Sequence, residues 1–296
     1  MDAVGGPRLK LNNGKSMPQF GLGVWQATPD ETAVAVAAAL DAGYRLIDTA
    51  AVYGNEDGVG RGIAGSSVPR EEIFVITKLW LNSFEYEKAL RAFDKSMARL
   101  GLDYLDLYLL HWPVPRDGDL IFEAYRALEK LLADGRVRAI GVCNHTPKLL
   151  DKLLARVTVT PVLNQIELHP YCIQKETRAA DAKHNIVTQS WSPIGGSSGS
   201  GGGKGMGGGK HLLSEPVLAA LGEKHGKTPA QIVLRWHVQN GLSVIPKSAN
   251  PKRIAENIDI FDFALSAEDM AAIDGLDTGQ RGGPDPEDIH VNSFNR

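Results

Sequence analysis

Eight short apolar segments recur along almost the whole chain, and this repetition limits the possible folds more than any other feature. The segments are rich in β-branched residues. Both of their faces are largely apolar, as expected for strands that are buried on both sides in a parallel sheet. We predict eight parallel strands within residues 20–25, 44–50, 73–80, 104–112, 138–144, 161–169, 186–194 and 242–248.

Segments with helical spacing lie between these strands. The clearest cover residues 30–43, 84–101, 120–135, 174–185 and 228–241. Repeated βα units over a chain of this length fit a (β/α)8 TIM barrel better than an open, doubly wound sheet. Near the N-terminus, Asn13-Gly14 lies between alternating residues. This pattern predicts a β-hairpin that plugs the bottom of the barrel.

A glycine-rich stretch lies between the seventh and eighth strands, and ten of the fifteen residues from 195 to 209 are glycine. It could be a linker between two domains, a phosphate-binding loop or a loop of one domain. A linker would leave an eighth unit too small to fold alone. Neither Lys204 in the stretch nor Lys210 just after it fits the phosphate-loop template G-x-x-x-x-G-K-[ST]. We therefore predict one domain over residues 1–296, with this stretch as a loop.

Composition excludes several classes of partner. The formal net charge is −3, so no overall basic field attracts nucleic acid. No apolar run reaches the length that spans a membrane, and the N-terminal residues lack the apolar core of a signal peptide. The two cysteines form neither a disulfide framework nor a metal-site spacing. We expect a cytoplasmic protein that binds no metal, nucleic acid or membrane.

Polar side chains stand where the apolar runs end, and this is where barrels of this kind place their chemistry. Taken singly, each side chain is best explained as one that makes a hydrogen bond to stabilise a loop. Six of them facing one mouth favour a functional site. The six are Asp48, Lys78, His111, Asn144, Gln165 and Ser192.

Tyr53 follows Asp48 on the next loop and completes a set suited to proton transfer. A free phenol has a pKa near 10, which is too high for an efficient acid at neutral pH. A neighbouring ammonium stabilises the phenolate and lowers that pKa, and a carboxylate holds the ammonium in place. We predict Tyr53 as the acid, Lys78 as the tuning group and Asp48 as its anchor, with His111 holding a substrate oxygen.

Five ordered motifs together resemble the aldo-keto reductase superfamily: LIDTAAVYGNE, VITKLW, LLHWP, VLNQIELHP, and VIPKS followed by RIAEN. The resemblance covers nearly the whole chain, and RGGPDP in the tail is similar to bacterial diketogluconate-reductase-like members. It implies a monomer that reduces small aldehydes and ketones with NADPH. Tyr53 then resembles the proton donor, Lys78 and Asp48 its tuning pair, and His111 the group that orients the carbonyl.

The resemblance also implies a cofactor site. Asn144 and Gln165 match residues that hold the nicotinamide carboxamide, and Trp191 matches the ring that stacks on the nicotinamide. Packing in the core is the alternative role for Trp191. The remaining implied contacts, from the first two strands and the loop after the seventh, are Gly23, Val24, Trp25, Asp48, Ser192, Pro193, Ile194, Gly195 and Ser198.

The adenosine half of the cofactor is matched by the segment after the eighth strand. Lys247, Ser248 and Arg253 resemble residues that contact the 2′-phosphate, and Glu256 and Asn257 resemble those at the adenine. Two cations beside one phosphate favour NADPH over NADH. A simple helical pair between Arg253 and Glu256 is the alternative.

For the substrate, Trp25, Trp80 and Trp112 match aromatic positions around the pocket mouth, beside Tyr53 and His111. The resemblance places the C-terminal tail over this pocket. It also places the glycine-rich loop over the cofactor pyrophosphate, and we expect residues 196–210 to be mobile without NADPH and more protected with it.

Two other functions compete with this interpretation. One is an NADPH-binding sensor or interaction subunit of the same fold with little turnover, against which the intact four-residue set argues. The other is a different barrel enzyme, such as a phosphate-handling isomerase. That enzyme would need a catalytic Glu or a metal cluster at the strand ends, and neither is apparent in the sequence.

Overall fold

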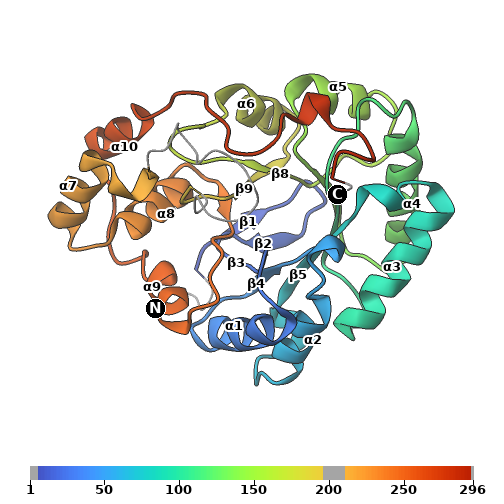
Figure 1. The fold of residues 1–296 in the computed structure, drawn as a ribbon, viewed down its shortest axis with the longest axis horizontal. Coiled ribbons are helices and arrows are strands. Elements are labelled where there is room, and N and C mark those ends of the chain that lie inside the picture. Colours follow the sequence, from blue (N-terminus) through green and yellow to red (C-terminus); the bar gives the residue numbers. More distant parts are fainter. Residues whose placement is uncertain (1–5, 196–210, 295–296) are drawn as a thin grey trace.

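Eight parallel strands form the centre of the computed structural model, which describes residues 6–195 and 211–294 (Figure 1). Each strand lies within one of the eight predicted segments. They are β3 (Leu22–Gly23), β4 (Leu46–Asp48), β5 (Phe74–Leu79), β6 (Leu107–Leu110), β7 (Ile140–Cys143), β8 (Leu163–Glu167), β9 (Val187–Trp191) and β10 (Ser243–Val244). Bridges between Phe20 and Val244 and between Gly23 and Lys247 join the two ends of the sheet. The predicted barrel is confirmed.

Helices surround the sheet, as Figure 1 shows. The described residues contain α1 (Pro29–Asp41), α2 (Glu56–Ala64), α3 (Tyr86–Leu100), α4 (Leu120–Ala133), α5 (Pro147–Leu154), α6 (Lys175–Lys183), α7 (Pro216–His225), α8 (Pro229–Gln239), α9 (Pro251–Ile258) and α10 (Ala267–Asp274). Local sequence signals explain where several of these helices begin. Thr28 and Thr228 each form a capping box before a helix that has proline in its first turn.

The N-terminal hairpin closes one end of the barrel, as predicted. It consists of β1 (Arg8–Lys10) and β2 (Ser16–Pro18), which pair antiparallel. The side chains of Leu11 and Met17 are buried against strand residues of the barrel interior. The bottom of the barrel is therefore filled by apolar packing.

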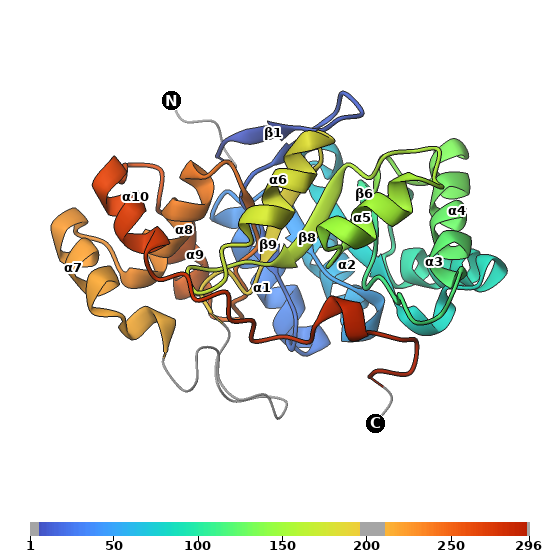
Figure 2. The same ribbon diagram turned by 90° about the horizontal axis from the view of Figure 1, so that it is seen from above.

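The C-terminal tail runs along the opposite end, and Figure 2 shows the hairpin and the tail on opposite sides of the barrel. Its backbone is fixed at several points. The N–H groups of Gly282 and Gly283 donate to the buried carboxylate of Glu167 at 2.6 and 3.1 Å. Farther along, the N–H of Val291 donates to Asp117 Oδ2 at 2.8 Å. The predicted placement of the tail is confirmed.

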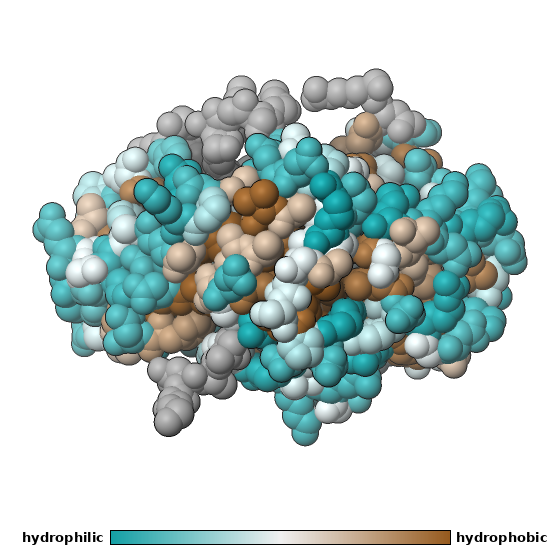
Figure 3. Space-filling view, turned by 90° about the horizontal axis from the view of Figure 1, so that it is seen from below, coloured by the Kyte–Doolittle hydropathy of each residue, from teal (hydrophilic) through white to brown (hydrophobic). Residues whose placement is uncertain are grey.

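The outer surface is mixed. Figure 3 views the side that carries α1 and α2, where hydrophobic residues gather near the middle and hydrophilic residues surround them. Val34 on α1 is 58% exposed. None of the helices in the described ranges is long and apolar enough to cross a membrane.

Candidate functional site

A buried ion pair lies at the end of the barrel under the tail. Asp48 is the last residue of β4, and Lys78 lies in β5. Lys78 Nζ donates to Asp48 Oδ1 at 2.6 Å and to the carbonyl of Thr49 at 2.8 Å. Burial opposes the charge on Lys78, but Asp48, with smaller contributions from Tyr53 and Cys143, outweighs it and raises the pKa of this amine. The site therefore holds a fixed ammonium.

Tyr53 lies beside that ammonium, at the end of a short 3-10 helix, Ala51–Tyr53. Lys78 Nζ is 5.1 Å from the centre of the Tyr53 ring. Burial raises the pKa of Tyr53 to about 12, although the charge of Lys78 acts in the lowering direction. The predicted lowering of the pKa of Tyr53 is therefore wrong: the ammonium acts in that direction, but burial is the larger effect, and the phenol is protonated at neutral pH.

His111 follows β6 and faces the same space. The centres of its ring and the Tyr53 ring are 5.6 Å apart. Burial, with a smaller contribution from Lys78, holds the pKa of His111 well below its usual range. Its Nδ1 has no hydrogen-bond partner among the described residues. The ring is therefore a neutral imidazole, able to hydrogen-bond to an uncharged oxygen.

A line of buried amides continues from Asp48 across the barrel. Gln165 Nε2 donates to Asp48 Oδ2 at 2.8 Å and to Gln189 Oε1 at 2.7 Å. Gln189 Nε2 donates in turn to Ser243 Oγ at 2.9 Å. The sequence analysis missed Gln189 and Ser243, which lie inside apolar runs. Ser243 lies between the apolar residues Leu242 and Val244, and this alternation is a signal that it faces the barrel interior. Gln189 lies between Thr188 and Ser190 in β9, so no such signal marks it.

Asn144 connects His111 with Trp191. Its Nδ2 donates to the carbonyl of His111 at 3.1 Å, and its Oδ1 accepts from Trp191 Nε1 at 2.8 Å. Trp191 is half-buried at the end of β9 and also packs against the core. The core contact supports the packing role considered for Trp191, and the hydrogen bond joins its ring to Asn144, another residue expected at the nicotinamide.

Aromatic rings form a wall beside His111. The centres of the Trp80 and His111 rings are 5.1 Å apart. The centre of the Phe294 ring, in the tail, is 5.3 Å from that of Trp80 and 5.4 Å from that of Trp112. Phe294 is 37% exposed and Trp25 is 50% exposed. The sequence analysis missed Phe294 because the tail has no periodicity that places it.

The residues expected at the adenosine half lie outside this buried network. The bridge between Gly23 and Lys247 places the segment after β10 beside the first strand of the barrel. Helix α9 carries Arg253, Glu256 and Asn257, of which only Asn257 is buried. Glu256 Oε1 accepts from Thr228 Oγ1 at 3.0 Å, and the described residues show no pair between Arg253 and Glu256.

The remaining cofactor candidates follow the strand ends. The N–H of Val24 donates to the carbonyl of Asp48 at 3.2 Å. After β9, Pro193 is buried, whereas Ser192, Ile194 and Gly195 are half-buried. Ser198 and the expected mobile loop, 196–210, lie outside the described residues.

Comparison with known proteins identifies the family. The model of the Aldo/keto reductase family matches residues 17–278. The chain belongs to this family. Membership confirms the family inferred from the five motifs, and with it an oxidoreductase of the aldo-keto reductase class.

Relatives of this aldo-keto reductase match it over nearly their full lengths. Morphine 6-dehydrogenase of Pseudomonas putida is 55% identical over 288 residues, 97% of each chain. A solved aldo/keto reductase from Brucella melitensis is 50% identical with a TM-score of 0.85, and the match covers 94% of this chain and 99% of that one. A mutant of Gox0644 solved with NADPH is 45% identical with a TM-score of 0.86, covering 96% and 98%.

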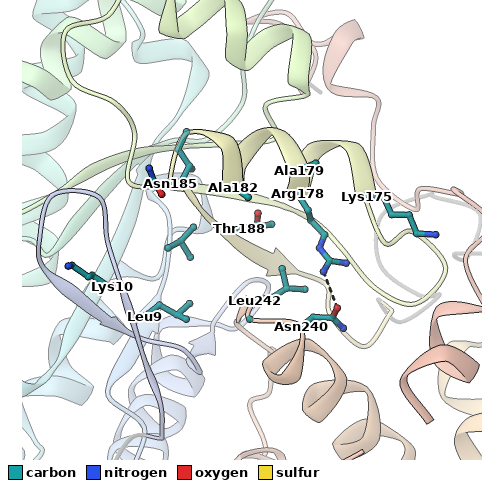
Figure 4. A pocket seen from close by; sticks show the side chains of 13 residues that line it. Leu9, Lys10, Lys175, Arg178, Ala179, Ala182, Asn185, Thr188, Asn240 and Leu242 are labelled. Carbon is teal, nitrogen blue, oxygen red and sulfur yellow. Dashed lines mark hydrogen bonds between the residues drawn. The ribbon is translucent and has the colours of Figure 1, made fainter. Parts of the chain in front are cut away.

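The aldo-keto reductase also has a cavity of about 640 Å³ at the opposite end of the barrel, shown in Figure 4. It is lined by Leu9 of the hairpin, by Thr188 near the start of β9 and by Leu242 just before β10. Arg178 donates to Asn240 Oδ1 at 3.0 Å across it. Because this end lies away from Tyr53 and His111, the cavity is separate from the candidate active site.

Proposed function

We propose that this aldo-keto reductase reduces aldehydes and ketones to alcohols with NADPH, and that Tyr53 is the proton donor. The observation that carries the proposal is the buried pair of Lys78 and Asp48 beside a protonated phenol and a neutral imidazole, all under the aromatic wall. Polar side chains gathered at one end of the barrel can orient a substrate carbonyl and stabilise the charge that develops on its oxygen.

Each residue has a defined task in this reaction. When bound, NADPH supplies the hydride from nicotinamide C4 to the carbonyl carbon. His111 holds the carbonyl oxygen, and the Tyr53 O–H delivers its proton to that oxygen as negative charge develops there. Lys78 stabilises the resulting phenolate, and Asp48 keeps the ammonium in place. Tyr53 carries its proton before the reaction starts, and the charge of Lys78 acts against the effect of burial on its pKa.

The described residues fit the nicotinamide end of NADPH. Asn144 and Gln165 present amides at the strand ends, beside the half-buried ring of Trp191. Side-chain amides can both donate to and accept from a carboxamide. We assign these three residues to the nicotinamide, with Gly23, Val24, Trp25 and Asp48 bordering it.

The rim of the barrel, formed here by the segment after β10 and by helix α9, suits the end of NADPH that carries the 2′-phosphate. Lys247 and Arg253 are exposed cations, and Arg253 has no ion-pair partner within the ranges that the structure describes. We assign Lys247, Ser248 and Arg253 to the 2′-phosphate and Glu256 and Asn257 to the adenine. The NADPH complex of the Gox0644 mutant supports this choice of cofactor.

Trp80, Trp112 and Phe294 suit small carbonyl compounds with an apolar or aryl group, because flat apolar side chains bind such groups. We further infer that the chain acts as one domain and as a monomer in the cytoplasm, as the family resemblance implies. Size-exclusion chromatography with light scattering tests the oligomeric state.

Rapid mixing of the enzyme with NADPH and a reactive aromatic aldehyde tests the proposed activity. We expect NADPH absorbance to fall with formation of the alcohol. A protein that binds NADPH but leaves it unoxidised with every aldehyde and ketone tried would instead be the sensor-type subunit.

A further inference from the structure

The backbone of Asn144 adopts a conformation that the surrounding structure must hold. Its φ is +60°, in the left-handed region that residues other than glycine seldom occupy. This turn directs the side chain so that its amide bonds both the carbonyl of His111 and the Trp191 indole. Any group that fixes this turn therefore also fixes the amide relative to the reaction site.

Asn164 holds the residue that follows this turn. Its Oδ1 accepts from the N–H of His145 at 3.2 Å, and its Nδ2 donates to the carbonyl of His145 at 2.9 Å. Both ends of one side-chain amide thus bind the backbone of one residue. Asn164 lies in β8, next to Gln165, and it is fully buried.

Asp181 of α6 is a further partner of the Asn164 amide. Asn164 Nδ2 also donates to Asp181 Oδ1 at 3.0 Å, and Asp181 Oδ2 accepts from Thr188 Oγ1 at 2.7 Å. The backbone N–H of His145 can only donate, so the oxygen of Asn164 must face it. The NH2 end of Asn164 is consequently left to donate to the carbonyl of His145 and to Asp181.

We propose that Asn164 is a positioning residue for the reductase reaction: it holds the left-handed turn through which Asn144 presents its amide to the nicotinamide. The proposal rests on the function proposed above for Asn144. If Asn164 were only a structural link between β7, β8 and α6, its loss would weaken binding of every part of the cofactor equally.

Binding to two ligands separates these roles. Isothermal titration calorimetry compares NADPH with 2′-phospho-ADP-ribose, which lacks the nicotinamide. For Asn164→Ala we expect the Kd of NADPH to rise about tenfold, the loss of roughly one hydrogen bond's net contribution. The Kd of 2′-phospho-ADP-ribose should stay unchanged. Equal weakening of both ligands, or no change in either, would overturn the proposal.

Thr188→Val is the matched control: Thr188 pairs with Asn164 between β8 and β9, and the change removes a buried hydrogen bond to Asp181 but none of those made by the Asn164 side chain. It should lower the melting temperature and leave both Kd values unchanged. If it raises the Kd of NADPH as much as Asn164→Ala does, the effect comes from the general stability of this region and the proposal fails.

A double-mutant cycle with Asn144→Ala links the two residues. Once the Asn144 amide is gone, adding Asn164→Ala should raise the Kd of NADPH little further. The losses of binding free energy caused by the two substitutions should therefore not add. Additive losses would contradict a role for Asn164 through Asn144. If Asn144→Ala alone leaves the Kd of NADPH unchanged, the assignment of Asn144 to the nicotinamide fails instead.

A second variant keeps the test usable if Asn164→Ala does not fold. The pair Asn164→Asp with Asp181→Asn keeps one hydrogen bond between the two side chains with reversed polarity, but it loses the donor to His145. We expect a folded protein in which only NADPH binds more weakly. Wild-type affinity for NADPH in this pair would refute the positioning role.

Discussion

The two ends of the barrel are filled in opposite ways. At the hairpin end, Leu11 and Met17 pack against apolar strand residues such as Leu107. At the mouth, the buried residues include the charged pair of Lys78 and Asp48, each hydrogen-bonded. Apolar burial stabilises the fold, whereas buried charge costs free energy unless it is paired. The comparison fits our proposal that the barrel is stabilised at one end and carries out its chemistry at the other.

Removing the ammonium should have the largest effect, because it affects both chemistry and stability at the mouth. Lys78→Met leaves Asp48 buried without its cation, which we expect to lower the free energy of unfolding by about 3–5 kcal/mol and turnover by about 10²–10⁴-fold. Denaturant unfolding and steady-state kinetics measure the two effects. Adding Asp48→Asn should recover stability but not turnover. Near-normal turnover in Lys78→Met would contradict the account.

A cavity at the hairpin end should reduce stability alone. Met17→Ala removes a fully buried side chain, and such changes cost about 2–5 kcal/mol of unfolding free energy. The turnover of the folded protein and its Kd for NADPH should stay at wild-type values. Met17→Leu, which conserves volume, should cost less than about 1.5 kcal/mol. A large loss of turnover in folded Met17→Ala would show that the two ends are not separable.

The carboxyl group of Asp181 should make stability depend on pH. Burial raises its pKa to about 7, whereas an unfolded Asp has a pKa near 4. The folded state then binds this proton more tightly, so its contribution to stability falls as pH rises from about 4 to 7. At about 1.4 kcal/mol per pKa unit, the full penalty above pH 7 reaches roughly 4 kcal/mol.

Asp181→Asn should therefore be more stable than the wild type at pH 8, with a much smaller difference at pH 5. Thermal unfolding at both pH values measures this, and the exposed Asp41→Asn serves as the control. A difference that does not change with pH would be evidence against a raised pKa.

The smallest effect is expected at the rim, where Arg253 is exposed. Arg253→Ala should raise the Kd of NADPH about tenfold, roughly 1.4 kcal/mol, and change the Kd of NADH little. Arg253→Lys keeps the charge but not the planar guanidinium, so its Kd for NADPH should lie between those of the wild type and Arg253→Ala. Equal effects on both cofactors would remove Arg253 from the 2′-phosphate site.

Local patterns predicted the strands well because each one is a compact apolar run. They did not predict α2, since three of its nine residues are glycine, which disfavours a helix. The packing against α1 explains this composition: a Cβ at Gly58 would lie 2.2 Å from the carbonyl oxygen of Pro29. Such an approach between helices is set by the tertiary structure and leaves no periodic signal.

The same contrast applies to the site. Asp48, Lys78 and His111 were visible because each ends an apolar run. Asn164 lies within a strand and Asp181 within a helix, and only the fold brings them together. The raised pKa of Tyr53 could not be predicted from the residue types either, because it depends on how deeply the mouth buries the ring.

Single-turnover hydride transfer in Tyr53→Phe tests the central claim most directly. The account predicts that NADPH binds with wild-type affinity, while its oxidation by an aromatic aldehyde slows by about 10²–10⁴-fold because the proton donor is absent. Oxidation of NADPH at the wild-type rate in this variant would contradict the role of Tyr53 and, with it, the proposed chemistry of the mouth.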